Sequence, residues 1–101
     1  MSMRMDENSI RFRIAPDDLA KLLETGELDQ RLAVGSRNFG YRIVARGAPV
    51  MTLDIAADGF VLAVPLSTLE HLQEMGRSKD GVSVQQGNLE VSLQVDLKRR
   101  A

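Results

Sequence analysis

The chain has 101 residues, a length that supports one hydrophobic core and predicts a single domain spanning residues 1–101. Hydrophobic residues make up 44% of the chain and charged residues 27%, as in folded globular proteins. A net charge of −1 and the absence of tryptophan argue against nucleic acid as a partner. The chain also has no cysteine, which excludes disulfides, thiol catalysis and thiolate metal ligands.

Two further absences bear on location. Residues 1–5 lack the apolar run of a signal peptide, and no stretch of the chain has the length and apolar character of a membrane span. We therefore expect a cytoplasmic protein that has no membrane partner.

The first half of the chain has the pattern strand, strand, helix, strand, strand. Apolar and polar residues alternate over Ile10–Ile14, and the same period over Met3–Met5 predicts that the two segments form a hairpin. Leucines at helical spacing predict a helix over residues 17–25, which Gly26 ends. Alternation over residues 32–45 predicts a second hairpin.

The second half repeats this order. Residues 51–64 alternate on both sides of a turn sequence and predict a hairpin. The pattern Ser67-Thr68-Leu69-Glu70 is typical of a capping box and predicts the start of a helix that ends at Gly76. A polar loop over residues 77–81 then leads to a last hairpin over residues 82–95.

A shift of fifty residues aligns these two halves without a gap and indicates an internal repeat of residues 1–50 and 51–100. The aligned pairs include Leu19 with Leu69, Leu22 with Leu72, Gly26 with Gly76, Val34 with Val84 and Asn38 with Asn88. The alternative is chance agreement, since alternation alone matches many apolar positions. The predicted fold class is α+β: two ββαββ repeats form a mainly antiparallel, eight-stranded curved sheet or barrel with two helices.

Strand alternation places the arginines of the first half opposite the predicted core. Five of them are expected on one sheet face: Arg4, Arg11, Arg13, Arg31 and Arg42. The corresponding face of the second half carries Asp54 and Glu90 among neutral polar residues.

Three interpretations of this face stay open. Arginines on a solvent-facing strand keep a sheet soluble and protect its edges. Alternatively, Arg4, Arg11, Arg13 and Arg42 form a ligand-binding site for a small anion, because guanidinium groups bind phosphate and carboxylate. A third interpretation is a homodimer in which the arginine face of one subunit meets Asp54 and Glu90 of another.

No catalytic or metal site is predicted, and no cofactor. His71 is the single histidine, and the sequence offers it no recognisable serine or carboxylate partner. The adjacent acids Asp17 and Asp18 suit the positive N-terminal end of a helix. The basic residues 98–100 are typical of a solvated chain end. Binding is therefore favoured over catalysis.

The segment Asn8-Ser9-Ile10-Arg11-Phe12-Arg13-Ile14, followed by a short helix, resembles a family of short, uncharacterised bacterial proteins. The resemblance covers residues 1–30 and implies no known activity. In topology only, the ββαββ order is similar to the triphosphate-tunnel fold, a barrel that binds polyphosphate and divalent metal. The glutamate-rich signature of that fold is absent at Met3-Arg4-Met5, so metal-dependent phosphohydrolysis is not implied.

Overall fold

The computed structural model describes residues 1–75 and 81–95 of the chain. These residues form eight strands and two helices, in the order predicted. The elements are β1 (Ser2–Met5), β2 (Ser9–Ile14), α1 (Pro16–Thr25), β3 (Glu27–Val34), β4 (Arg37–Arg46), β5 (Thr52–Ala56), β6 (Gly59–Pro65), α2 (Leu66–Met75), β7 (Val82–Gln86) and β8 (Leu89–Val95).

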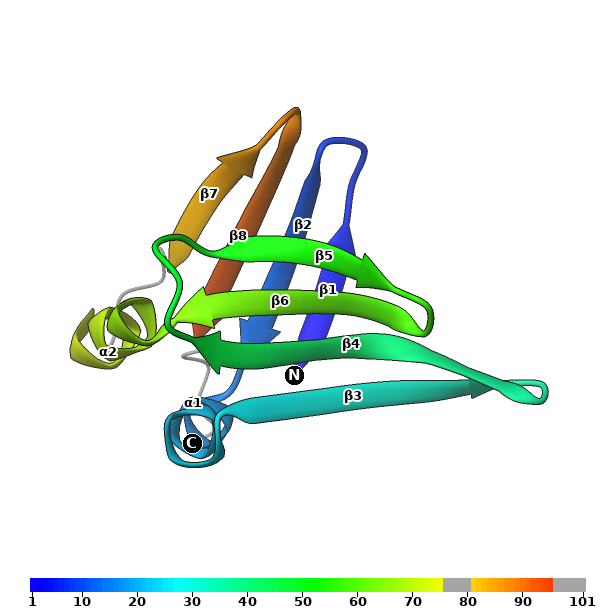
Figure 1. Ribbon diagram of the computed structural model, residues 1–101, viewed down its shortest axis with the longest axis horizontal. Coiled ribbons are helices and arrows are strands. Elements are labelled where there is room, and N and C mark those ends of the chain that lie inside the picture. The colour runs from blue at the N-terminus through cyan, green and yellow to red at the C-terminus, as the bar shows by residue number, and fades with distance from the viewer. Residues whose placement is uncertain (76–80, 96–101) are drawn as a thin grey trace, which may run out of the picture.

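The described strands lie in two four-stranded sheets (Figure 1). Sheet A has the order β1-β2-β8-β7 and sheet B the order β3-β4-β6-β5. Each hairpin is antiparallel, whereas the central pairs β2 with β8 and β4 with β6 are parallel. The α+β class with two ββαββ-like units is confirmed. Because α1 and α2 each carry the chain from one sheet to the other, two mixed sheets form in place of one curved sheet or barrel.

The two units exchange hairpins in an equivalent way. Phe12 pairs with Leu93 across the centre of sheet A, and Ile43 pairs with Leu62 across sheet B. The shift of fifty relates these pairs, since 12 + 50 = 62 and 43 + 50 = 93. Two backbone hydrogen bonds, Glu90 N to Asn8 O and Gly40 N to Asp58 O, are related by the same shift.

One part of the gapless alignment is wrong. Val34 ends its strand opposite Arg37, whereas Val84 lies in the middle of its hairpin opposite Val91. The hairpin of β3 and β4 is longer than that of β7 and β8, so its turn falls at a different point of the unit. The repeat as an ancestral duplication stays a prediction.

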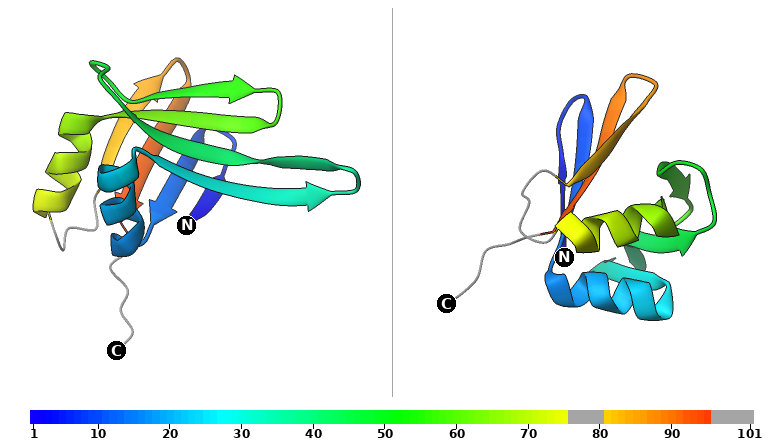
Figure 2. Two further views of the ribbon diagram at one scale, coloured as in Figure 1. Left: turned by 60° about the horizontal axis from the view of Figure 1, so that its bottom comes forward. Right: turned by 90° about the vertical axis from the view of Figure 1, so that its left-hand side faces the viewer.

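The hydrophobic core lies between the two sheets and is closed at one end by the helices (Figure 2). Phe12, Leu62 and Leu93 are fully buried there, as are Leu22 and Leu69 from the helices. None of the buried side chains among the described residues is polar or charged. Burial of these side chains is the main favourable term that holds the sheets together.

Local sequence determines where the helices that connect the two sheets begin and end. At the start of α1, the carboxylate of Asp18 accepts a hydrogen bond of 2.9 Å from the backbone N–H of Ala15. At its end, Gly26 has a φ of 86° and donates to the carbonyl of Leu22. α2 begins at Leu66, so Ser67 lies inside the first turn and is not the predicted cap. Neither helix, over the residues described, is long and apolar enough to span a membrane.

The hairpin of β3 and β4 projects well beyond the rest of the molecule (Figure 1). We call residues 32–39 the arm. Leu32 and Phe39 face each other in register on the same side of the sheet as the buried Ile43. They are nevertheless 67% and 49% exposed, because the arm extends past the part of sheet B that sheet A covers.

Candidate functional site

Three of the predicted arginines gather on the outer face of sheet A. Arg4 of β1 lies directly opposite Arg11 of β2, and Arg13 follows two residues further along β2, opposite Ser2. All three are exposed, while the intervening residues of β2 are buried. Strand alternation therefore placed these side chains correctly, and we call Arg4, Arg11 and Arg13 the arginine cluster.

The arginine cluster has no acidic partner within residues 1–75 and 81–95. Glu90 of β8 is on the same face, in register with Ser9, but forms no ion pair with the cluster. The three side chains line an open hollow of about 240 Å³ together with Ser2 and Met3. Like charges directly opposite each other destabilise a strand pair, so an anion bound here would relieve their repulsion.

Arg31 and Arg42 lie on the outer face of sheet B, so the expectation that five arginines share one face is wrong. The crossover α1 places β3 and β4 in the second sheet, and the two sheets pack through their apolar inner faces. The outer faces consequently point in opposite directions. Parity along a strand predicted the outward orientation, but it carried no information on which sheet a strand joins.

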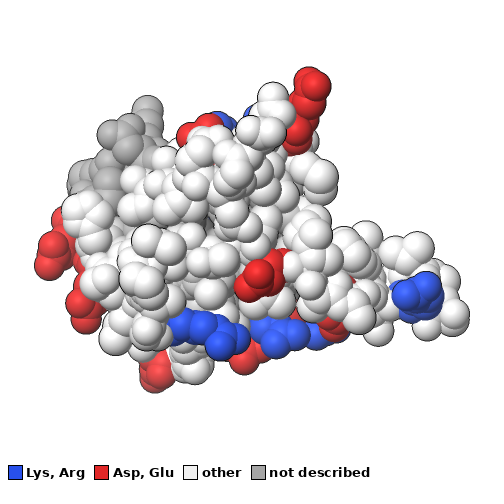
Figure 3. Space-filling model, turned by 45° about the horizontal axis from the view of Figure 1, so that its top comes forward, with Lys and Arg blue, Asp and Glu red and all other residues white. Residues whose placement is uncertain are grey.

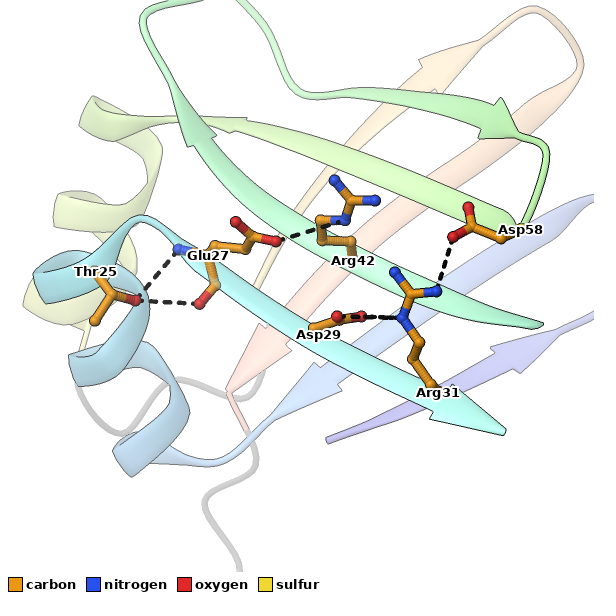
Figure 4. Close-up of polar contacts among 6 residues, drawn as sticks. All are labelled: Thr25, Glu27, Asp29, Arg31, Arg42 and Asp58. Carbon is orange, nitrogen blue, oxygen red and sulfur yellow. Dashed lines mark hydrogen bonds and ion pairs between the residues drawn. The ribbon is translucent and has the colours of Figure 1, made fainter. Parts of the chain in front are cut away.

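Arg31 bridges two carboxylates (Figure 4). Its Nη1 atom is 2.8 Å from Oδ2 of Asp58, and its Nε atom is 3.3 Å from both carboxylate oxygens of Asp29. The hydrogen bond from Arg31 is the main cause that lowers the pKa of Asp58, and the same bond raises the pKa of Arg31. Arg31 is thus engaged within the molecule.

Arg42 has an acidic neighbour as well, although its buried Nε atom donates no hydrogen bond among the described residues. Its Nε atom lies 3.6 Å from Oε2 of Glu27 (Figure 4). Thr25 holds the start of β3, since its hydroxyl accepts a hydrogen bond from the backbone N–H of Glu27. The space among Asp29, Arg31, Arg42 and their neighbours is only about 10 Å³, no more than one water needs. This cluster is therefore an ion-pair network on the outer face of sheet B, with space for about one water molecule.

Sequence reasoning missed the carboxylates of this network. Glu27, Asp29 and Arg31 have the same parity on one strand, and that signal alone places them side by side. Asp58 comes from the turn between β5 and β6, and no local pattern connects it to Arg31. The predicted acidic face is also wrong, because Asp54 lies on sheet B and Glu90 on sheet A.

His71 lies on the exposed side of α2 and lines a second open hollow of about 280 Å³ with Ser67, Thr68 and Ser83. Over the part of the chain that is described, no group of His, Asp or Glu residues could hold a metal ion. The predicted basic residues 98–100, the predicted helix end Gly76 and residues 77–80 of the predicted polar loop lie outside the described residues.

Tyr41 yields a prediction for alkaline pH. Its ring packs edge-on against Phe12 with centroids 5.4 Å apart; burial raises the pKa of Tyr41, and the negative charge of Asp18 adds to the effect. Folding favours the neutral phenol, so its contribution to stability is complete below the unfolded pKa of 10.0 and is lost as pH rises through the folded pKa.

The measurement is direct, because Tyr41 is the single tyrosine and the chain has no tryptophan. A titration followed by phenolate absorbance is expected to show a midpoint above 10.0 for the folded protein. The same chain in denaturant serves as control. Equal midpoints in the two states would contradict the prediction.

The fold and site define a small α+β domain in which two ββαββ-like units exchange hairpins, and one sheet displays arginines that have no acidic partner among the described residues. A family model matches residues 1–99, and the chain belongs to that family, a family of unknown function (DUF7009). No curated protein and no solved structure matches the chain.

Proposed function

We propose that this protein binds a small anion, phosphate or carboxylate, on the outer face of sheet A. The observation that carries the proposal is the arginine cluster, three exposed guanidinium groups on two paired strands without an acidic partner among the described residues. Guanidinium groups offer paired N–H donors that match the oxygens of both anions. Arg42 is left out of the site because it lies on sheet B beside Glu27.

Several features support binding in place of catalysis. The cluster offers positive charge and N–H donors, and sheet A holds it on regular strands and not on a loop. Its hollow of about 240 Å³ has room for a small anion and is open to solvent. We propose in addition that the protein is cytoplasmic, where phosphorylated metabolites are common.

The test is a thermal-shift screen at low salt against phosphate, pyrophosphate, triphosphate and simple carboxylates. A ligand at ten times its Kd stabilises the folded state by about 1.4 kcal/mol, which raises the Tm of a domain of this size by roughly 6–11 °C. The shift is expected to shrink as salt is added, because exposed charges are screened.

The variant that tests the site is Arg11→Ala with Arg13→Ala, in which the shift is expected to disappear. Arg46→Ala is a control of the same charge type, since Arg46 is exposed at the end of β4 in the other sheet. The absence of a shift with every anion would refute the proposal. A shift that survives the double substitution would place the anion elsewhere.

A second candidate function is self-association, and a different surface favours it. The homodimer expected from the sequence joined an arginine face to an acidic face, but Asp54 and Glu90 lie on different sheets. The apolar arm supports self-association instead.

A further inference from the structure

We propose that the arm and the hollow at its base form a two-fold interface with a second copy of this chain. None of the three arginines of the arginine cluster lines the hollow at the base of the arm, although Met3 of β1 borders both hollows.

The first argument is exposed apolar surface. Large apolar side chains lie open along the free end of sheet B and on the adjacent β1: Met5 (57% exposed), Leu32 (67%), Val34 (59%), Phe39 (49%) and Ile55 (81%). Leu32 and Val34 alternate onto the side of the sheet that faces the core, and Ile55 pairs with Phe60 on the same side. Phe60 in turn contacts Phe39 edge-on, with ring centroids 6.0 Å apart.

The second argument is shape. An open hollow of about 350 Å³ lies at the base of the arm, with Met3, Leu32, Phe39 and Tyr41 among its lining residues. A projecting apolar arm and an apolar hollow therefore adjoin on one molecule. A two-fold axis beside them would insert the arm of each copy into the hollow of the other, which is the self-complementary contact that an isologous dimer requires.

The third argument is charge. Arg31 borders the hollow, but Asp29 and Asp58 neutralise it. Within residues 32–39 the one charged residue is Arg37, which pairs in register with Val34 near the end of the arm, where Figure 3 shows basic atoms. The surface thus offers little to a polyanion such as nucleic acid, whereas a second copy presents a surface of the same apolar character.

The fourth argument is area. Five large apolar side chains exposed to this degree leave on the order of 450 Å² per copy, as large as the biggest apolar patch of a typical monomer. Two copies would bury about 900 Å² of apolar surface. At the usual apolar share of an interface, this corresponds to roughly 1,600 Å² in total, the size of a stable protein interface.

The test is the mass of the full chain in solution by sedimentation equilibrium. The dimer is expected at 2 × 11.2 kDa, that is 22.4 kDa. Leu32→Glu, at a position with little intramolecular burial, is expected to raise the dimer Kd about thirtyfold or more without lowering the Tm of the monomer. Ser83→Glu, an exposed position of β7 in sheet A, is the charge-matched control and is expected to leave the dimer intact.

A second measurement does not depend on the affinity change. Because the chain has no cysteine, Val34→Cys introduces a single thiol on the arm, and a bifunctional maleimide is expected to join two copies. Ser83→Cys is the matched control that is expected to stay uncrosslinked. A mass of 11.2 kDa at near-millimolar protein would overturn the proposal, as would a monomer that binds neutral phosphatidylcholine vesicles through the arm.

Discussion

Replacement of Gly40 by alanine is expected to lower the free energy of unfolding by about 3 kcal/mol or more. Gly40 lies inside β4, in register with Arg31 on one side and Gly59 on the other. A Cβ atom added at Gly40 would lie 1.9 Å from the carbonyl oxygen of Gln30 and 2.9 Å from the Cα atom of Arg31. Both neighbours are backbone atoms of the adjacent strand, so relief requires β3 and β4 to move apart.

The position of Gly40 also explains why a glycine is needed there. The guanidinium of Arg31 reaches past this point to Asp58, in the turn that precedes β6, and Gly40 lines the small space beside it. A wider separation of β3 from β4 would stretch that ion pair as well. Gly59→Ala is expected to be as damaging, because Gly59 has a φ of 143° and its Cβ would lie 1.8 Å from the carbonyl oxygen of Gly40.

Thermal and denaturant unfolding measure this effect. A loss of about 3 kcal/mol corresponds to a fall in Tm of roughly 12–24 °C for a domain of this size. Gly47→Ala is the matched control, since a Cβ at Gly47 has no atom within 4 Å and the residue needs no positive φ. Equal Tm values for Gly40→Ala and Gly47→Ala would show that the close contact does not matter for stability.

Replacement of Gln86 by methionine is expected to destabilise the protein by about 2 kcal/mol, because two hydrogen bonds of roughly 1 kcal/mol each are lost. The side-chain amide of Gln86 on β7 pairs with the backbone of Leu53 on β5. Its Oε1 atom accepts from the N–H of Leu53 at 2.9 Å, and its Nε2 atom donates to the carbonyl of Leu53 at 2.8 Å. The amide thereby acts as a one-residue strand that joins the edge of sheet A to the edge of sheet B.

The variant Gln86→Glu distinguishes the contributions of these two hydrogen bonds to stability by their dependence on pH. The ionised glutamate accepts from Leu53 N–H but repels the carbonyl of Leu53, whereas the protonated acid both accepts and donates. The penalty of Gln86→Glu relative to the parent is therefore expected to shrink as pH falls below about 4.3. Gln85→Leu is the control, since among the described residues the Gln85 side chain bonds within its own turn, to the carbonyl of Gly87. Hydrogen exchange at the Leu53 amide is expected to be faster in Gln86→Met than in the parent. Unchanged exchange there would contradict the assignment of the stability loss to the bonds between Gln86 and Leu53.

Local patterns predicted the elements well for a physical reason. Strand alternation and helical spacing reflect which side chains must leave water, and this requirement acts within a few residues. Ile10, Phe12 and Ile14 were expected in the core and are buried, while Arg11 and Arg13 between them are exposed. The helix expected over residues 17–25 is α1, which begins one residue earlier at Pro16.

The candidate site was predictable only in part. Arg4, Arg11 and Arg13 belong to one hairpin, so parity and a short turn were sufficient to bring them together. Arg42 belongs to a hairpin on the far side of α1, and its neighbour Glu27 comes from β3. The sequence predicted one sheet in place of two, because the parity of a residue along its strand distinguishes the core side from the solvent side but does not tell which sheet the strand joins.

The sequence by itself determined the class, the element order, the core-facing residues of β2 and the charge of the outer face of the first hairpin. These properties follow from local periodicity and turn chemistry. Only the tertiary structure decided that hairpins are exchanged between the units, that Arg31 pairs with Asp58, and that the arm extends past the part of sheet B that sheet A covers. Each of these depends on hydrogen bonds and packing between segments far apart in the chain, which no short window of sequence encodes.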